Sequence, residues 1–262
     1  PYVSLLDGIA MGGGIGISVH GRYRIITERT VFAMPETGIG FFPDVGGSYF
    51  LPRCPGELGM YLGLTGDRLK GAEAVYAGVG TAYMPSTAIP NLLGDLAELK
   101  AEPADARVAV EAAIGRHFTP HEVPKIAAQQ SRIDRLFSGP SYPAILAALE
   151  AESDEPFAAR TLATLSAKSP TSLKLTYRLL REGRRKMLDH CLDMEFRLAL
   201  RCMKGHDFYE GVRSVIVDKD NKPQWRPSDL NSVSDDGIAA YFVPLPPAEE
   251  LGLVPDPKQR LT

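Results

Sequence analysis

Residues 2–18 read YVSLLDGIAMGGGIGIS, and this stretch decides the fold. It begins with a short apolar segment, residues 2–6, that is typical of a buried strand and ends at the turn dipeptide Asp7-Gly8. Three consecutive glycines, Gly12, Gly13 and Gly14, then precede an apolar run that is compatible with a helix. The stretch therefore predicts a strand, a tight glycine turn and the N-terminus of a helix.

Strands and helices alternate through the first third of the chain. Short strands are predicted at 23–26, 31–33 and 78–83, and apolar residues at helical spacing predict helices at 56–64 and 70–77. From about residue 89 a helical period predicts helices at 92–99, 107–114, 143–150, 156–167 and 171–181. We therefore expect an α/β fold with a mostly helical second half, divided into residues 1–90, 91–230 and an irregular tail at 231–262.

The composition is that of a globular protein. Of the 262 residues, 44% are hydrophobic and 23% are charged, and 29 Lys and Arg stand against 32 Asp and Glu. The net charge of −3 gives no broad attraction to nucleic acid. Glycines, charges and prolines interrupt every apolar stretch before it could cross a membrane, so we expect neither a nucleic-acid nor a membrane partner.

Cysteine and histidine spacing argues against a metal site. Cys54, Cys191 and Cys202 match neither a disulfide framework nor a CxxC metal motif, so we expect buried free thiols in a reducing compartment. His117 and His121 are four residues apart, but Pro120 between them interrupts the helix that would place both on one face. No metal ligand is predicted.

The glycine run has two interpretations. At a helix N-terminus, glycines leave backbone N–H groups uncovered, and the helix dipole there favours negative charge, so Gly12, Gly13 and Gly14 could hold an oxyanion. Tight packing is the competing explanation. The spacing matches neither GxGxxG nor a phosphate loop, which argues against nucleotide binding by those routes.

Two carboxylates stand in a second segment, residues 32–47. Glu36 and Asp44 are eight residues apart in a stretch that otherwise holds apolar residues, Gly, Pro and Thr. A buried, charged carboxylate is costly, so the pair suggests acid–base or nucleophilic chemistry. The structural alternatives are an exposed loop acid for Glu36 and an N-cap for Asp44, because Gly46-Gly47-Ser48 is typical of a helix start.

These segments together resemble the crotonase (enoyl-CoA hydratase/isomerase) superfamily. The resemblance rests on the glycine run, on Met34-Pro35-Glu36 about twenty residues later, and on residues 42–47 and 64–69. Within the superfamily, residues 11–14, 18–21, 32–37, 169–174 and 207–213 are similar to a subfamily that hydrolyses short 3-hydroxyacyl-CoA thioesters. The similarity spans residues 1 to about 230.

The resemblance implies a turn-and-spiral β core with flanking helices, and an acyl-CoA substrate whose coenzyme A needs no further cofactor. It implies that Gly13, between Gly12 and Gly14, gives one of two backbone N–H groups to the thioester oxygen. Glu36 matches the principal catalytic carboxylate of the family, and Asp44 matches the second acid of the hydrolase subfamily. The implied reaction yields the free acid and coenzyme A.

Departures from the family pattern separate its members. Hydratases carry a catalytic glutamate where this chain has Gly16 and a glycine where it has Asp44, so hydration is the weaker prediction and isomerisation a minor one. A non-catalytic structural subunit is a further alternative, because the basic residues at 181–186 could contact RNA or a protein. A cluster at a helix C-terminus, or a contact to coenzyme A phosphate, explains those residues better.

The first strand starts at the first residues of the sequence, so we expect the native protein to begin upstream, where the family carries the second oxyanion amide. A homo-oligomer is compatible with the resemblance. The family pattern places the protein in the cytoplasm of a bacterium or in the mitochondrial matrix of a eukaryote.

Overall fold

The computed structural model describes residues 1–100, 102 and 104–254, and the chain in it forms two compact units. The first unit comprises residues 1–33 and 68–131, and the second comprises residues 34–67 and 132–262. The chain thus leaves the first unit after one strand and returns to it before another. This division differs from the expected linear regions 1–90, 91–230 and 231–262.

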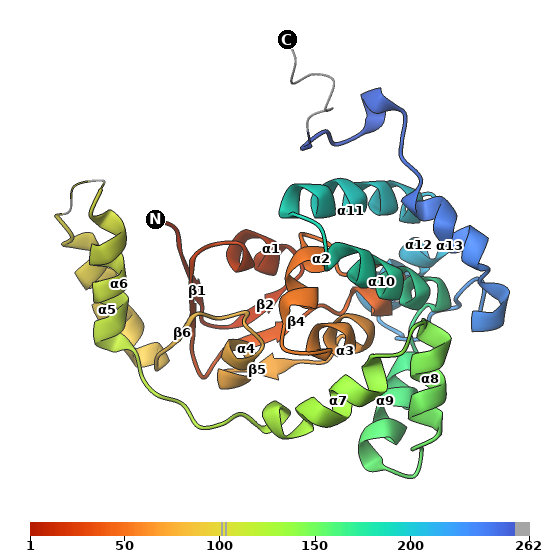
Figure 1. Ribbon diagram of the computed structural model, residues 1–262, viewed down its shortest axis with the longest axis horizontal. Helices are drawn as coiled ribbons and strands as arrows, with labels where there is room; N and C mark the ends of the chain where they lie inside the picture. The colour runs from red at the N-terminus through yellow and green to blue at the C-terminus, as the bar shows by residue number, and fades with distance from the viewer. Residues whose placement is uncertain (101, 103, 255–262) are drawn as a thin grey trace. The chain divides into compact units, whose positions relative to one another are not determined.

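The first unit holds the strands. Two three-stranded sheets, ordered β1-β3-β6 and β2-β4-β5, are parallel except for the β4–β5 pair. Its elements are β1 Val3–Leu6, β2 Ile9–Met11, α1 Gly13–Val19, β3 Tyr23–Ile26, β4 Val31–Ala33, β5 Leu69–Lys70, α4 Ala72–Tyr76, β6 Ala82–Tyr83, α5 Ile89–Ala97 and α6 Ala106–His117 (Figure 1).

The strands repeat as a spiral. Val3 pairs with Tyr23 in one sheet and Ile9 pairs with Val31 in the other, so each turn of chain lays two strands beside those of the turn before. Asp7 braces the corner between the two sheets, since its carboxylate accepts hydrogen bonds from Thr27 Oγ1 at 2.6 Å and from Arg29 Nε at 3.0 Å. The Arg29 guanidinium holds the pKa of Asp7 below its usual value. The expected β-spiral is therefore confirmed.

The second unit is helical. Helix α10 packs against α2, α3, α8 and α13, and α11 packs against α2, α12 and α13 (Figure 1). Its elements are α2 Gly47–Phe50, α3 Leu58–Thr65, α8 Tyr142–Glu150, α9 Pro156–Ser166, α10 Pro170–Gly183, α11 Leu188–Cys202, α12 His206–Val212 and α13 Asp235–Phe242, with α7 Gln130–Phe137 at its border with the first unit. None of the described helices is long and apolar enough to cross a membrane.

Most predicted elements have the expected type, and two regions differ. The strands at 23–26 and 31–33 agree residue for residue with β3 and β4, whereas the strand predicted at 78–83 is reduced to Ala82–Tyr83. The expected irregular tail contains α13, which Ser234 caps by accepting a hydrogen bond from the Gly237 N–H. Residues 255–262 of that tail lie outside the described residues.

Glycines allow the helices of the second unit to approach closely. A Cβ at Gly59 in α3 would lie 1.7 Å from the carbonyl oxygen of Leu51, and one at Gly183 in α10 would lie 2.0 Å from that of Ser48. Both obstacles are backbone atoms, so no side-chain rotation relieves them.

We therefore expect Gly59→Ala to lower the free energy of unfolding by about 2 kcal/mol or more, because α3 must move off the segment that carries Leu51. Gly94→Ala in α5 is the matched control, since a Cβ there meets no atom within 4 Å and alanine favours a helix. Urea unfolding of both variants measures the difference. Equal stabilities would contradict the close packing described for α3.

Candidate active site

Glu36 opens a short 3-10 helix, Glu36–Ile39, in the second unit. The next residue fixes this helix from two sides, because Thr37 Oγ1 donates to the carbonyl of Leu64 at 3.1 Å and the Thr37 carbonyl accepts from the Ser169 N–H at 3.3 Å. Leu64 lies in the last turn of α3, and Ser169 caps α10. Two helices thus position the carboxylate of Glu36.

The Glu36 side chain is 6% exposed, and its Oε2 has no hydrogen-bond partner among the described residues. Burial raises the pKa of Glu36 to about 8, and the nearby charge of Asp44 adds to the rise. The backbone N–H of Glu36 and the charge of Lys168 act in the opposite direction. Leaving such an atom unpaired costs stability, which is typical of a group kept for chemistry. The exposed-acid explanation is therefore wrong.

Asp44 and Lys168 are the charged groups that act on Glu36. Burial raises the pKa of Asp44 above its usual value, and burial lowers the pKa of Lys168 below its own. The Lys168 ammonium lies against the 3-10 helix, where a Cβ at Gly38 would be 3.1 Å from Nζ. The structure thus surrounds Glu36 with one acid and one base, both partly desolvated.

The loop that carries Asp44 has an unusual backbone. Val45 adopts φ 52° and Gly46 adopts φ 85°, so a β-branched residue occupies the left-handed region. The loop leads into α2, whose N-cap residue is Gly46 and which has no side-chain cap from its own segment. The explanation of Asp44 as the helix cap is therefore wrong.

Glu195 of α11 supplies the missing cap. Its carboxylate accepts hydrogen bonds from the Gly46 N–H at 2.8 Å, from the Ser48 N–H at 2.9 Å and from the Ser48 hydroxyl at 2.5 Å. Glu195 is 4% exposed, and burial raises its pKa to about 7 in spite of these donors. A carboxylate at a helix N-terminus is favourable, so Glu195 holds the strained loop that presents Asp44.

The sequence analysis did not identify Glu195 or Lys168. Glu195 has a detectable signal, because it lies within a buried helical stripe whose other members are apolar: Cys191, Met194, Leu198 and Cys202. An acid on such a face needs a partner. Lys168 follows no periodic pattern.

The three glycines belong to the first unit, whereas Glu36 and Asp44 belong to the second. Helix α1 begins at Gly13 after Gly12, which has φ 50°. Gly13 and Gly14 are exposed, and a Cβ on either would meet no atom within 4 Å. The first N–H groups of a helix have no partner inside it, so these amides are free to face a ligand. The structure thus brings the two acids together and describes the glycines separately.

The remaining candidates carry no chemistry in this structure. Cys54, Cys191 and Cys202 are buried free thiols, as predicted, and burial raises the pKa of each. Within the described part of the chain, no three His, Cys, Asp or Glu side chains gather as metal ligands would.

Comparison with known proteins places this geometry in a family. Residues 1–242 match the family description Enoyl-CoA hydratase/isomerase. The chain is 49% identical over 248 residues to the mitochondrial 3-hydroxyisobutyryl-CoA hydrolase of Xenopus tropicalis, covering 94% of this chain and 64% of that protein. It is 43% identical over 247 residues to the human protein of the same name, covering 92% and 63%. The chain thus spans just under two thirds of the length of these relatives.

Solved structures agree with the fold. A carnitinyl-CoA dehydratase from Mycobacterium thermoresistibile superposes with a TM-score of 0.86 at 37% identity, covering 98% of this chain and 71% of that one. An enoyl-CoA hydratase from Rhodobacter sphaeroides gives a TM-score of 0.81 at 37% identity, covering 96% and 70%. The resemblance seen in the sequence is confirmed, and the chain belongs to the enoyl-CoA hydratase/isomerase (crotonase) family.

Proposed function

We propose that the protein hydrolyses 3-hydroxyisobutyryl-CoA, or a similar short 3-hydroxyacyl-CoA, to the free acid and coenzyme A. The observation that carries the proposal is the buried Glu36 carboxylate, which has an unpartnered Oε2 and lies beside Asp44. The curated relatives named 3-hydroxyisobutyryl-CoA hydrolase support the substrate class.

Glu36 acts on the thioester carbon. Its raised pKa makes the ionised carboxylate a stronger base and nucleophile than an ordinary glutamate. Either a water loses its proton to Glu36 as it attacks the carbon, or Glu36 Oε2 attacks and water then hydrolyses the resulting anhydride. In both routes the C–S bond breaks, coenzyme A leaves as thiolate and the released acid takes the water oxygen.

The other residues have supporting roles. Asp44 orients the 3-hydroxyl of the substrate or assists the proton transfer. Backbone N–H groups at the start of α1, with Gly13 first, stabilise the thioester oxygen as negative charge develops on it. The lowered pKa of Lys168 makes this ammonium a ready proton donor near Glu36. No cofactor besides the coenzyme A of the substrate takes part.

Hydration of an enoyl-CoA is the second candidate, because solved relatives at 37% identity are named enoyl-CoA hydratase and carnitinyl-CoA dehydratase. Gly16 stands where a hydratase is expected to carry its first glutamate, which argues against it. Crotonyl-CoA hydration, followed by loss of absorbance, distinguishes the two reactions in the assays below.

Glu36→Gln is expected to abolish release of coenzyme A thiol from 3-hydroxyisobutyryl-CoA, since the amide can neither attack nor accept the proton. The assay is run on this chain and on a form extended at its N-terminus to the length of its relatives. Glu150→Gln, an exposed glutamate on α8, is the matched control and should keep full turnover. Near-normal turnover by a folded Glu36→Gln variant would remove Glu36 from this role.

The pH dependence follows from the raised pKa of Glu36. The reaction needs the carboxylate, so kcat/KM should rise with pH and level off above about 8. Stability changes in the opposite direction. The folded state binds the Glu36 proton more tightly than the unfolded state, so ionisation between pH 4.5 and about 8 lowers the free energy of unfolding.

Glu36→Gln should therefore melt at a higher temperature than the wild type above pH 8, and this difference should vanish near pH 4.5. Stopped assays with a no-enzyme blank and thermal melts across the pH range measure the two effects. A rate profile that levels off near pH 5, with no stabilisation of the variant, would contradict the buried state of Glu36.

Glu195→Gln is expected to lower kcat about tenfold with little change in KM, because the amide turns a donor toward Gly46 or Ser48 and releases the loop of Asp44. It should also lower the melting temperature. Ser48→Ala is the milder control, since both backbone N–H bonds remain.

Asp44→Asn should lower kcat with no loss of melting temperature, since Asp44 caps no helix. The kcat and KM of all three variants, with their melting curves, test the separation of roles. A Glu195→Gln variant that melts lower but keeps its kcat would show that Glu195 only stabilises the fold.

A further inference from the structure

A cavity of about 920 Å³ opens in the second unit, away from the two acids. Its walls are α10, the loop at residues 138–143, the turn after α10 and the start of α13. Neither Glu36, Asp44 nor Glu195 lines it. Its size is in the range of small-molecule sites, so it can hold a ligand of its own.

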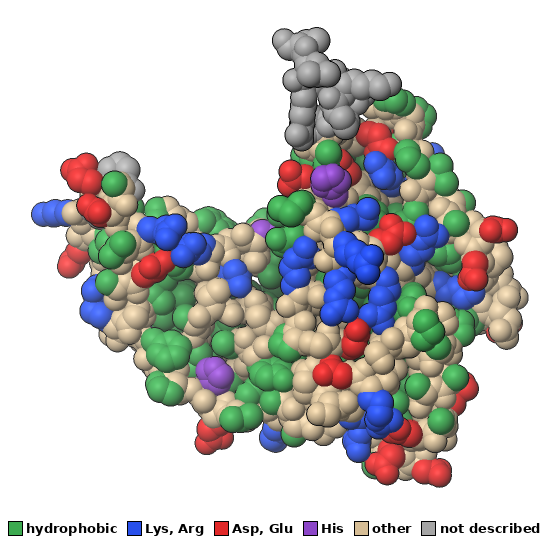
Figure 2. Space-filling model, viewed as in Figure 1, with side chains coloured by type: hydrophobic (Ala, Val, Ile, Leu, Met, Phe, Trp, Pro, Cys, Tyr) green, Lys and Arg blue, Asp and Glu red, His purple; other side chains and the backbone are tan. Residues whose placement is uncertain are grey.

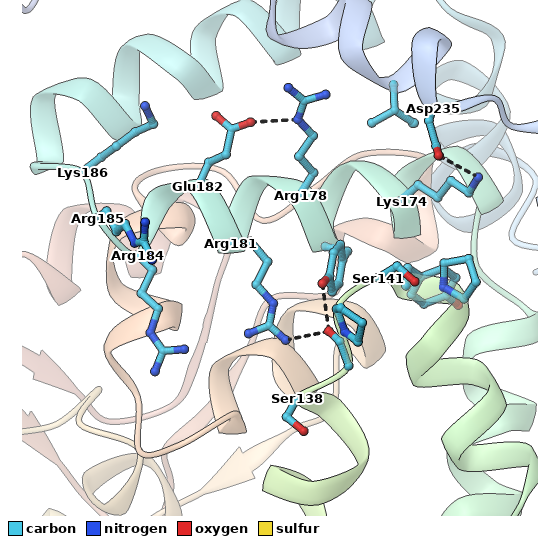
Figure 3. A pocket seen from close by; sticks show the side chains of 16 residues that line it. Ser138, Ser141, Lys174, Arg178, Arg181, Glu182, Arg184, Arg185, Lys186 and Asp235 are labelled. Atoms are coloured by element: carbon cyan, nitrogen blue, oxygen red, sulfur yellow. Dashed lines mark hydrogen bonds and ion pairs between the residues drawn. The ribbon is translucent and has the colours of Figure 1, made fainter.

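Cations gather along one wall of this cavity. Lys174, Arg178 and Arg181 recur every three or four residues on α10, and Arg184, Arg185 and Lys186 follow where the helix ends. Figure 2 shows these Lys and Arg side chains as a patch over α10, and Figure 3 shows them around the cavity. A cluster at a helix C-terminus explains cations in the last turn, but not a row that begins at Lys174.

Part of this charge is already neutralised. Glu57 binds the Arg181 guanidinium through both carboxylate oxygens, at 2.9 and 2.8 Å, and reaches Arg184 at 3.4 Å. Arg181 also donates to the Phe137 carbonyl at 2.8 Å, which fixes the wall toward which it turns in Figure 3. Arg181 is therefore part of the framework of the cavity.

The other pairs lie along the helix. Arg178 binds Glu182 at 2.8 Å, and Lys174 reaches the exposed Asp235 at 3.4 Å (Figure 3). Three carboxylates thus face six cations. Within the described part of the chain, the side chains of Arg185 and Lys186 make no ion pair. The excess of positive charge is concentrated at the end of the cavity where α10 terminates.

We propose that this cavity binds a nucleoside diphosphate, at a site separate from the acyl substrate. The phosphates lie against Arg184, Arg185 and Lys186, since arginine forks and lysine ammonium groups are the usual partners of phosphate oxygens. The base and sugar lie along Tyr177 and Pro140, on the half of the cavity that carries little free charge.

A nucleotide fits this cavity better than an RNA chain. The cavity is bounded, and Glu182 and Asp235 lie in its lining, where they would repel a phosphate backbone that continued past the cationic end. The net charge of the whole chain is −3, so there is no broad basic surface to carry a long polyanion.

Calorimetric titration of this chain with ADP tests the proposal. ADP should bind at a single site with a Kd below about 1 mM at about 0.15 M salt, and inorganic pyrophosphate should bind more weakly because it lacks the organic part. Replacing Arg184, Arg185 and Lys186 together by Ala should weaken ADP at least tenfold with an unchanged melting curve. Arg160→Ala, at an exposed position of α9 outside the cavity, should bind as the wild type does.

Competition identifies the source of the nucleotide. Coenzyme A carries the same adenosine diphosphate chemistry, so saturating coenzyme A should leave ADP binding unchanged if the site is separate. Displacement of ADP by coenzyme A, or no ADP binding, would overturn the proposal. So would pyrophosphate binding as tightly as ADP, full ADP binding by the triple variant, or tighter binding of a single-stranded RNA with a steep salt dependence.

Discussion

The carboxylate of Glu195 ties the loop of the second acid to the helical half of the chain. It accepts three hydrogen bonds from Gly46 and Ser48, 147 to 149 residues away in sequence, at the buried N-terminus of α2. Without them, a helix end and a left-handed valine would both lie unsupported in the interior. The orientation of Asp44, and through it the charge felt by Glu36, depends on this contact.

The second unit gives up stability to keep Glu36 reactive. A carboxylate with an unpartnered oxygen in an apolar site is costly, and neighbouring Asp44 adds repulsion. The cost is borne by the surrounding packing, in which Thr37 connects the 3-10 helix to the end of α3 and to the start of α10. A partly desolvated lysine, Lys168, supplies the compensating positive charge. Sites that trade stability for chemistry in this way are typical of enzymes.

Local chemistry made much of the fold predictable from the sequence. The apolar strands at 23–26 and 31–33 and the corner at Asp7-Gly8 are short-range features, and the structure reproduces them. Helix α13 was missed although Ser234 and two following acids are ordinary N-terminal signals, because the abundance of Pro and Asp around it favoured an irregular tail. The chain's path between two units depends on contacts between distant segments, which periodicity does not encode.

The candidate site divides in the same way. Glu36 and Asp44 could be found because two acids in an apolar stretch need an explanation, whereas Glu195 acts on them from a distant helix. The most direct test of the buried Glu36 is carbon NMR titration of side-chain carboxyls labelled in glutamate, with Glu36→Gln assigning the signal. The account predicts that this signal titrates near pH 8, and titration near the ordinary 4.5 would contradict it.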